Sequence, residues 1–410
     1  MSASVHARLS AMMFIQFFIW GAWFVTLGTY LARLGFGGAD IGFAYLTNNI
    51  GAMVAPFLVG MVADRFFSSE KLLGVLHICG ALMLFIVSDL VAQSAIIIGL
   101  VLYNICYMPT LALVNSVSFG VMNTPDTEFP KVRVWGTLGW IAAGLVISFG
   151  LSGFVSDVEA TSVPMKLAAG ASLLLGLYSF TLPSTPPQNA GSKTTMRDLL
   201  GLDALALLKD RSFAVFALCS LLVSIPLAFY YAFTNLFLNE AGMSSVAATM
   251  SLGQASEVFF MVLMPLLFVR LGVKWMLLAG MLAWVLRYAL FAAGDWETAS
   301  WMLYGGILLH GICYDFFFVT GQIYVDQKAD KSIRASAQGF IAMLTYGVGL
   351  AIGSVLAGAT VDYFTAEGVK DWPSIWWVPC IFAAFVALLF QVTFKDDTKR
   401  EKAAEVPARP

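Results

Sequence analysis

Charge is scarce in this sequence. Only 12% of its 410 residues are Asp, Glu, Lys or Arg, whereas 59% are hydrophobic. A soluble globular domain carries about 25% charged residues, so this chain has too little polar surface for a water-soluble enzyme. The formal net charge of −2 leaves no basic excess with which to bind nucleic acid.

Cysteine pairs and catalytic motifs are also missing. The five cysteines all lie in apolar segments without CxxC spacing, which speaks against a disulfide framework or a zinc site: Cys79, Cys106, Cys219, Cys313 and Cys380. The sequence shows no phosphate-binding loop, HExxH, catalytic triad or Rossmann motif, so nothing supports an ATP-driven pump or a membrane enzyme, and we expect no cofactor. We expect no cleavable signal peptide, because the first apolar stretch continues past Trp20 toward Leu31.

Long apolar stretches recur along the chain, separated by short polar connections. Their approximate limits are 9–32, 41–63, 72–91, 94–119, 131–152, 163–182, 213–238, 246–269, 275–293, 299–325, 335–361 and 374–394. A transmembrane helix needs about 20 apolar residues, whereas a barrel strand needs about 10 residues that alternate in polarity. The sequence therefore predicts an all-α membrane protein with twelve transmembrane helices.

Lysine and arginine predict the orientation of these spans. With twelve spans both termini lie on one side, which then carries 18 of the 23 basic residues. The opposite side has only Arg33, Lys166 and Lys370, and Arg133 and Arg287 fall within or at the edge of spans. The positive-inside rule therefore places both termini in the cytoplasm.

The longest internal polar stretch divides the spans into two sets of six. We expect a first six-helix bundle at 1–182, a cytoplasmic linker at 183–211, a second bundle at 212–394 and a tail at 395–410. In the linker, Thr195 is placed to begin a short amphipathic helix at the membrane interface; a plain tether is the alternative. GLVLYNICY (99–107) and GILLHGICY (306–314) stand at equivalent spans, which favours a duplicated bundle typical of transporters with a midplane site.

The connection between spans two and three carries a recognisable motif. GMVADRFFSSEK (60–71) resembles the loop signature of the major facilitator superfamily through Gly60, Asp64 and Arg65. Gly60 permits close helix contact, and the two charged residues suit a conformational charge relay. The alternative is a surface charge cluster that follows the positive-inside rule.

A narrower resemblance covers nearly the whole chain. It rests on FIQFFIWGAWF (14–24), YMPTLALVNS (107–116), FPKVRVWGTLGW (129–140), LLGLDALALLKD (199–210), GQASEVFF (253–260), YDFFFVTG (314–321) and IRASAQG (333–339). These segments are similar to the bacterial nucleoside:proton symporter family. The resemblance implies a major facilitator fold and import of nucleosides coupled to protons.

Span five carries the first candidate binding residues. Arg133, Thr137 and Trp140 are spaced i, i+4, i+7 and share one helical face. A guanidinium, a hydroxyl and an indole suit the polar edges and the flat face of a nucleoside, and the family resemblance implies the same role. The alternative is that Arg133 only anchors the cytoplasmic end of the helix.

Polar residues on spans eight and ten supply the other candidates, because ionisable groups inside a membrane are costly. We expect Gln254 and Glu257 to contact substrate, as the resemblance also implies; a structural pair of Glu257 with Arg287 is the alternative. Asp315 and Glu257 are the candidates for proton coupling; the alternative for Asp315 is a fixed ion pair between spans.

The same stretch departs from the family pattern. His310 stands where the family leads us to expect a tyrosine, and Tyr314 where it leads us to expect a phenylalanine. On span seven, Ala228 and Tyr231 replace the expected glutamine and asparagine. His310, Tyr314 and Tyr231 still suit substrate contact; the alternatives are a satisfied interior histidine and aromatic helix packing. These differences leave the nucleoside, purine or pyrimidine, open.

Together these observations predict a proton-driven nucleoside importer of the bacterial inner membrane, working by alternating access as a monomer. Its partners are the nucleoside, the proton and the lipid bilayer. The alternatives are a major facilitator transporter for another hydroxylated solute such as a sugar, and a non-transporting receptor or membrane enzyme.

Overall fold

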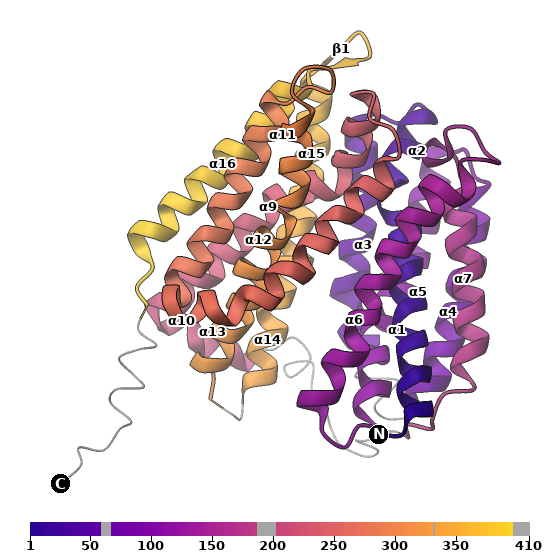
Figure 1. The fold of residues 1–410 in the computed structure, drawn as a ribbon, viewed down its shortest axis with the longest axis vertical. Coiled ribbons are helices and arrows are strands. Elements are labelled where there is room, and N and C mark those ends of the chain that lie inside the picture. Colours follow the sequence, from indigo (N-terminus) through magenta and orange to yellow (C-terminus); the bar gives the residue numbers. More distant parts are fainter. Residues whose placement is uncertain (59–66, 187–201, 331–332, 397–410) are drawn as a thin grey trace. The chain divides into compact units, whose positions relative to one another are not determined.

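A computed structural model describes residues 1–58, 67–186, 202–330 and 333–396 of the chain. Gly60, Asp64, Arg65 and Thr195 lie outside these residues, so the predictions made for them are not pursued. Almost every described element is a helix: α1 (Ala3–Phe24), α2 (Leu27–Arg33), α3 (Gly38–Leu58), α4 (Ser69–Ser88), α5 (Gln93–Phe119), α6 (Pro125–Leu145), η2 (Val146–Leu151), η3 (Val158–Ala160), α7 (Val163–Ser179), η4 (Leu202–Lys209), α9 (Arg211–Glu240), α10 (Val246–Ala293), α11 (Ser300–Leu308), α12 (His310–Tyr314), η5 (Asp315–Val319), α13 (Thr320–Lys328), α14 (Arg334–Ala342), η6 (Met343–Gly349), α15 (Leu350–Tyr363) and α16 (Trp372–Thr393). A two-residue antiparallel ribbon, Thr365–Ala366 with Val369–Lys370, joins α15 to α16 (Figure 1).

Nine helical stretches among the described residues are long and apolar enough to cross a membrane. One of them, α10, has 48 residues and is broken at Gly272, whose φ of 72° is one that L side chains rarely adopt. At about 1.5 Å per residue it is long enough for two crossings. With α3 and the shorter apolar α7, the helices account for the twelve predicted spans, and the all-α membrane fold is confirmed.

The helices form two compact units. Unit 1 comprises Met1–Thr195, Ala228–Gln254 and Ser354–Tyr363, and unit 2 comprises Met196–Leu227, Ala255–Gly353 and Phe364–Pro410. Parts of α9, α10 and α15 from the second half of the sequence therefore belong to unit 1. The predicted bundle boundaries, which follow the sequence halves, stay a prediction.

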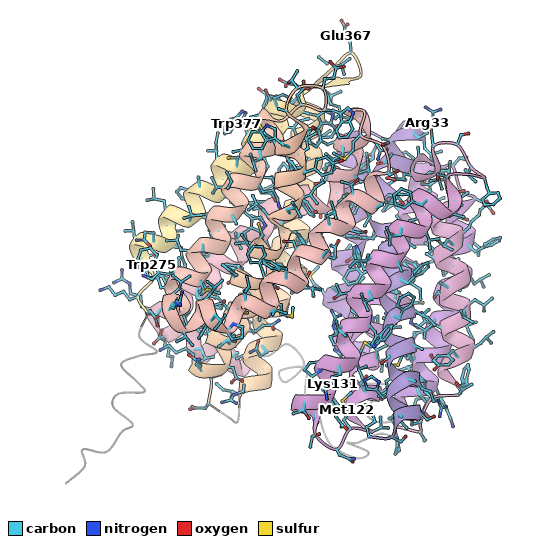
Figure 2. All side chains as sticks on the ribbon, viewed as in Figure 1. Arg33, Met122, Lys131, Trp275, Glu367 and Trp377 are labelled. Carbon is cyan, nitrogen blue, oxygen red and sulfur yellow. The ribbon has the colours of Figure 1, made fainter. Side chains whose placement is uncertain are left out.

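In unit 1, helices α1 and α3 to α7 run side by side (Figure 1), with α1 packed on α6 and α4 between α5 and α7. Buried polar side chains join them: Gln16 on α1 donates to Thr110 on α5, and Asn104 donates to Thr47 on α3. These bonds hold the helices together within their apolar surroundings. Met122 and Lys131 lie at one end of the unit and Arg33 at the other (Figure 2), which we call the far end because it lies away from the N-terminus.

Unit 2 has a core around Met264, Met276 and Phe316. Large apolar side chains such as Val262, Val269 and Leu388 are mostly exposed, as expected of helices that face lipid. Within the linker the structure describes residues 183–186 and 202–211, of which Leu202–Lys209 form a 3₁₀-helix. The amphipathic helix expected to begin at Thr195 stays a prediction.

Candidate functional site

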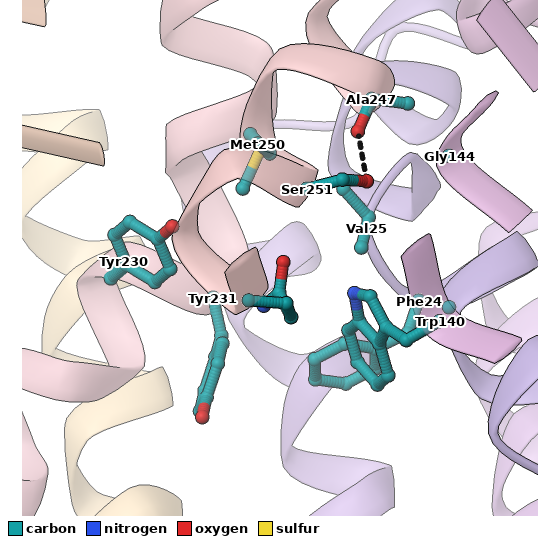
Figure 3. A pocket seen from close by; sticks show the side chains of 11 residues that line it. Phe24, Val25, Trp140, Gly144, Tyr230, Tyr231, Ala247, Met250 and Ser251 are labelled. Atoms are coloured by element: carbon teal, nitrogen blue, oxygen red, sulfur yellow. Dashed lines mark hydrogen bonds between the residues drawn. The ribbon is translucent and has the colours of Figure 1, made fainter. Parts of the chain in front are cut away.

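A pocket in unit 1 is formed by helices α1, α6, α9 and α10 (Figure 3). The pocket is partly open. Eleven residues line it: Gly21, Phe24, Val25, Trp140, Gly144, Tyr230, Tyr231, Ala247, Met250, Ser251 and Gln254. Three of these, Trp140, Tyr231 and Gln254, are residues that the sequence predicts to bind substrate.

Aromatic rings form much of this pocket. Trp140 meets Trp20 edge to face with ring centroids 5.6 Å apart, and Tyr231 meets Phe24 in the same way at 5.8 Å. The adjacent Tyr230 and Tyr231 rings lie 5.9 Å apart. Such packing fixes the orientation of the rings and leaves apolar faces toward the pocket, a surface that suits a flat ligand.

The polar groups of the pocket are few. Ser251 donates its hydroxyl hydrogen to the carbonyl oxygen of Ala247, one turn back on α10. The buried Oε1 of Gln254 has no hydrogen-bond partner among the described residues. An amide oxygen in this position is costly unless a donor reaches it, which a polar ligand in the pocket is placed to supply.

Arg133 and Thr137 precede Trp140 on the same face of α6, and neither lines the pocket. Both are half-buried. The Arg133 guanidinium carbon lies 4.1 Å from the centroid of the Phe17 ring on α1, a cation–π contact. This contact ties Arg133 to α1.

In unit 2, the carboxyl group of Asp315 is completely buried. Neither of its oxygens has a hydrogen-bond partner within the part of the chain that the structure describes. Asp315 is also the first residue of η5, a π-helical turn within the α11–α13 stretch. Such turns are frequent at functional sites because they alter the direction of side chains within a helix. The nearby charge of Glu257 acts on Asp315 electrostatically.

His310 and Tyr314 complete this cluster in unit 2. His310 is buried, and its Nε2 lies 4.0 Å from Oε2 of Glu257. The rings of His310 and Tyr314 stack 5.9 Å apart, and the Tyr314 hydroxyl is 3.1 Å from that of Tyr346. The structure thus brings together four predicted residues: Glu257, His310, Tyr314 and Asp315.

Two further side chains of unit 2 contact this cluster, and only Arg287 was considered from the sequence, as the alternative structural partner of Glu257. Arg287 is fully buried, donates through Nε to the carbonyl oxygen of Gly306 at 3.0 Å, and acts electrostatically on His310. Tyr346, on η6, contacts both Tyr314 and the Phe318 ring at 5.3 Å. The charge of Arg287 is visible in the sequence, whereas Tyr346 gives no signal there because tyrosine is common in membrane helices.

The predicted residues fall into two groups. Unit 1 holds Arg133, Thr137, Trp140, Tyr231 and Gln254, and unit 2 holds the cluster around Asp315. The two groups meet along the chain at α10, where Gln254 and Glu257 are one turn apart.

Comparisons with known proteins give a consistent result. The profile of a family described as "Nucleoside H+ symporter" matches residues 3–399. The chain is 42% identical to a protein of Escherichia coli (strain K12) named "Putative nucleoside transporter YegT", over 98% of this chain and 97% of that protein. It is 36% identical to the xanthosine permease of the same organism, over 97% and 98%. A crystal structure of the nucleoside transporter NupG superposes with a TM-score of 0.86 at 33% identity, covering 95% of this chain and 99% of that one.

Proposed function

The chain belongs to the nucleoside H+ symporter family, and from this premise we propose that it moves nucleosides and protons together across the membrane by alternating access. The relatives are named as transporters and permeases, so the prediction of a transporter rather than an enzyme is confirmed. Nucleoside selectivity, proton coupling and the import direction belong to the proposal.

The observation that carries the proposal is the Asp315 carboxyl, which is completely buried and has no hydrogen-bond partner among the described residues. A buried charge without a partner is costly, so a group in this setting binds a proton or a counter-ion. We propose that Asp315 takes up the transported proton. Glu257 lies in the same cluster of unit 2, with its Oε2 4.0 Å from Nε2 of His310, and we propose it as the second candidate for proton coupling.

The pocket in unit 1 supports a nucleoside as substrate. The Trp140 and Tyr231 rings offer apolar faces to a nucleobase, and the unpaired Gln254 oxygen accepts a hydrogen bond from an amino group or a ribose hydroxyl. We propose that Arg133 and Thr137, together with Glu257, His310 and Tyr314, contact the same substrate during the transport cycle.

The proposed orientation follows from charge. The basic residues predict that both termini face the cytoplasm, and the relatives are bacterial permeases. We therefore place the protein in the bacterial inner membrane, with the far end of unit 1 on the periplasmic side, and propose that it works as a monomer.

Uptake in proteoliposomes tests the proposal. Labelled uridine and adenosine are expected to accumulate only when the outside is more acidic than the inside, and accumulation is expected to stop when a protonophore removes the gradient. Accumulation that persists without the gradient would contradict proton coupling.

The alternative substrate class is tested in the same preparation. An excess of unlabelled nucleosides is expected to suppress uptake, and an equal excess of glucose, galactose or free ribose is expected to leave it unchanged. Competition by a hexose as strong as that by a nucleoside would favour the sugar transporter instead.

A further inference from the structure

A buried carboxylate of unit 1 lies outside the proposed substrate and proton sites. Glu159, in the short η3 helix between α6 and α7, is only 7% exposed. Its Oε1 accepts the backbone N–H of Ala247 at 2.9 Å, and its Oε2 accepts the side-chain amides of Asn235 at 2.8 Å and Asn239 at 3.3 Å. These three donors come from the second half of the sequence, although they belong to unit 1. The Ser148 hydroxyl, from the first half, also donates to Oε1, at 3.2 Å.

The bond to Ala247 caps a helix. Since α10 begins at Val246, the N–H groups of Ala247 and Ala248 lie in its first turn, where no carbonyl within the helix can accept them. Glu159 accepts the first, and the Ser148 hydroxyl oxygen accepts the second at 2.9 Å. A negative charge at this position is also favoured by the helix dipole.

A second carboxylate caps another helix in the same manner. Asp362, at the end of α15, accepts the backbone N–H groups of Gly38 at 2.5 Å and Ala39 at 2.8 Å. These are the first two residues of α3. Here a residue from the second half of the sequence caps a helix of the first half, again within unit 1.

The two caps stand at equivalent places in the duplicated halves. Val246 follows Gly38 by 208 positions and Asp362 follows Glu159 by 203, close to the 207 positions that separate the similar segments starting at Gly99 and Gly306. The repeat therefore places one carboxylate in each half on the N-terminus of an equivalent helix in the other half.

Small residues let these helices approach. A side-chain carbon on Gly144 would collide with Ser251 and Ala247 of α10, and one on Gly358 would lie 2.5 Å from the carbonyl oxygen of Gly38. The first turns of α10 also line the pocket, through Ala247, Met250 and Ser251. The caps thus hold in place helix ends that border the proposed substrate pocket.

We propose that Glu159 and Asp362 are a pair of latches that stabilise the state in which the far end of unit 1 is closed. When this end opens, each carboxylate leaves its helix N-terminus and both become hydrated. This inference rests on the alternating access proposed above. It assigns a role to residues that bind neither nucleoside nor proton.

Cysteine accessibility tests the latches without any substrate or gradient. Met250→Cys, made in a chain whose five native cysteines are replaced by serine or alanine, reports opening at the far end through its reaction with a membrane-impermeant maleimide. The reagent is added to the side opposite the termini. Glu159→Gln replaces one acceptor with an amide donor that faces the donors of Asn235 and Asn239, and Asp362→Asn does the same to the N–H pair of α3.

Glu159→Gln is expected to speed labelling about tenfold, because a buried charged cap stabilises the closed state more than an exposed cap does. Asp362→Asn, whose side chain is exposed, is expected to speed labelling about threefold. The double variant is expected to show roughly the product of the two effects, since the caps share no residue.

The matched control is Asp89→Asn. Asp89 pairs with Lys166 at 2.7 Å beside η3 and α7, but this ion pair lies within the first half of the sequence. The variant is expected to leave labelling unchanged. Unchanged labelling in both latch variants, or an equal increase in the control, would overturn the proposal. Faster labelling in Glu159→Gln but not in Asp362→Asn would overturn the claim that the two carboxylates act as a pair. If Glu159→Gln does not reach the membrane, the comparison of Asp362→Asn with the control decides. Failure of nucleoside uptake would not affect this readout.

Discussion

Two buried polar sites in this protein differ in how far their polar atoms are hydrogen-bonded. In unit 1, His77 lies between Ser172, 2.9 Å from Nδ1, and Gln16, 2.7 Å from Nε2, and Gln16 in turn donates to Thr110. In unit 2, the equally buried Asp315 has no hydrogen-bond partner among the described residues. The first site is satisfied and joins four helices. At the second site the carboxyl oxygens lack hydrogen-bond partners among the described residues. A carboxyl group in this setting is able to gain and lose a proton.

The largest effect is expected from Asp315→Asn. The amide cannot take up and release a proton, so gradient-driven accumulation of nucleoside is expected to fall by about 100-fold or more, while exchange of labelled for unlabelled nucleoside continues. Uptake and counterflow in the same proteoliposomes measure the two activities.

A matched change on the same helical stretch serves as control. Asp326→Asn removes a half-exposed carboxylate that pairs with Arg334 at 3.0 Å, and it is expected to change neither activity by more than about twofold. Full gradient-driven accumulation by Asp315→Asn would show that the proton binds elsewhere.

His77→Ala is expected to act on stability and not on coupling. It leaves the side-chain oxygen of Gln16 without its partner, which costs about 1–3 kcal/mol for an unsatisfied buried group, whereas the Ser172 hydroxyl still donates to the backbone carbonyl of residue 77 at 3.0 Å. Thermal unfolding in detergent is expected to occur at a clearly lower temperature, with the dependence of uptake on the proton gradient retained. If His77→Ala instead lost proton coupling while its thermal stability stayed unchanged, the contrast between a structural site at His77 and a proton site at Asp315 would be wrong.

Two tryptophans extend the comparison to aromatic residues. Trp140 lines the pocket, whereas Trp23 is 1% exposed and packs edge to face on Tyr103 at 5.2 Å. We expect Trp140→Ala to raise the KM for nucleoside about tenfold, as loss of one stacking contact would do. Trp23→Ala is expected to lower stability by about 3–5 kcal/mol. Kinetics and melting curves of both variants separate the roles, and an unchanged KM in Trp140→Ala would contradict the proposed pocket.

The smallest expected effect is a pH dependence of stability that arises from Asp210, a residue outside the membrane spans. Burial of Asp210 acts to raise the pKa of this carboxyl, but the Phe213 N–H at 2.8 Å and the charge of Lys328 at 3.3 Å outweigh it and lower the pKa below 3.8. A lowered pKa contributes stability that is complete above about pH 4 and is lost as the pH falls through the folded-state value.

Because the Asp210 side chain is 39% exposed, this contribution is expected to be below about 1 kcal/mol. The melting temperatures of the native protein and Asp210→Asn are therefore expected to differ slightly at pH 7 and to converge as the pH falls through the folded-state pKa of Asp210. A difference that grows toward pH 3 would have the wrong sign.

The sequence predicts the helices well because membrane spans are specified by length and apolarity alone. Predicted limits of 94–119 compare with Gln93–Phe119 for α5, and 374–394 with Trp372–Thr393 for α16. The expected spans 246–269 and 275–293 lie on either side of Gly272, whose non-helical φ of 72° breaks α10 between them. The π-helical turn at Asp315, by contrast, leaves no trace in residue periodicity.

The candidate sites are only partly predictable. Asp315, Glu257 and His310 stand out because ionisable residues are rare in membrane spans, whereas Met250 and Ser251 are ordinary residues that line the pocket only through packing. Glu159 looks like a loop residue in the sequence. Its importance comes from the N–H of Ala247, 88 positions away, a contact that only the folded chain brings about.

The central claim is that nucleoside and proton cross together through Asp315. The most direct measurement is of proton entry, with a pH-sensitive dye enclosed in weakly buffered proteoliposomes to which uridine or adenosine is added without an imposed gradient. We predict that nucleoside acidifies the interior of vesicles with the native protein and not of those with Asp315→Asn, which still exchanges nucleoside. Nucleoside entry without acidification, or equal acidification by the variant, would contradict the account.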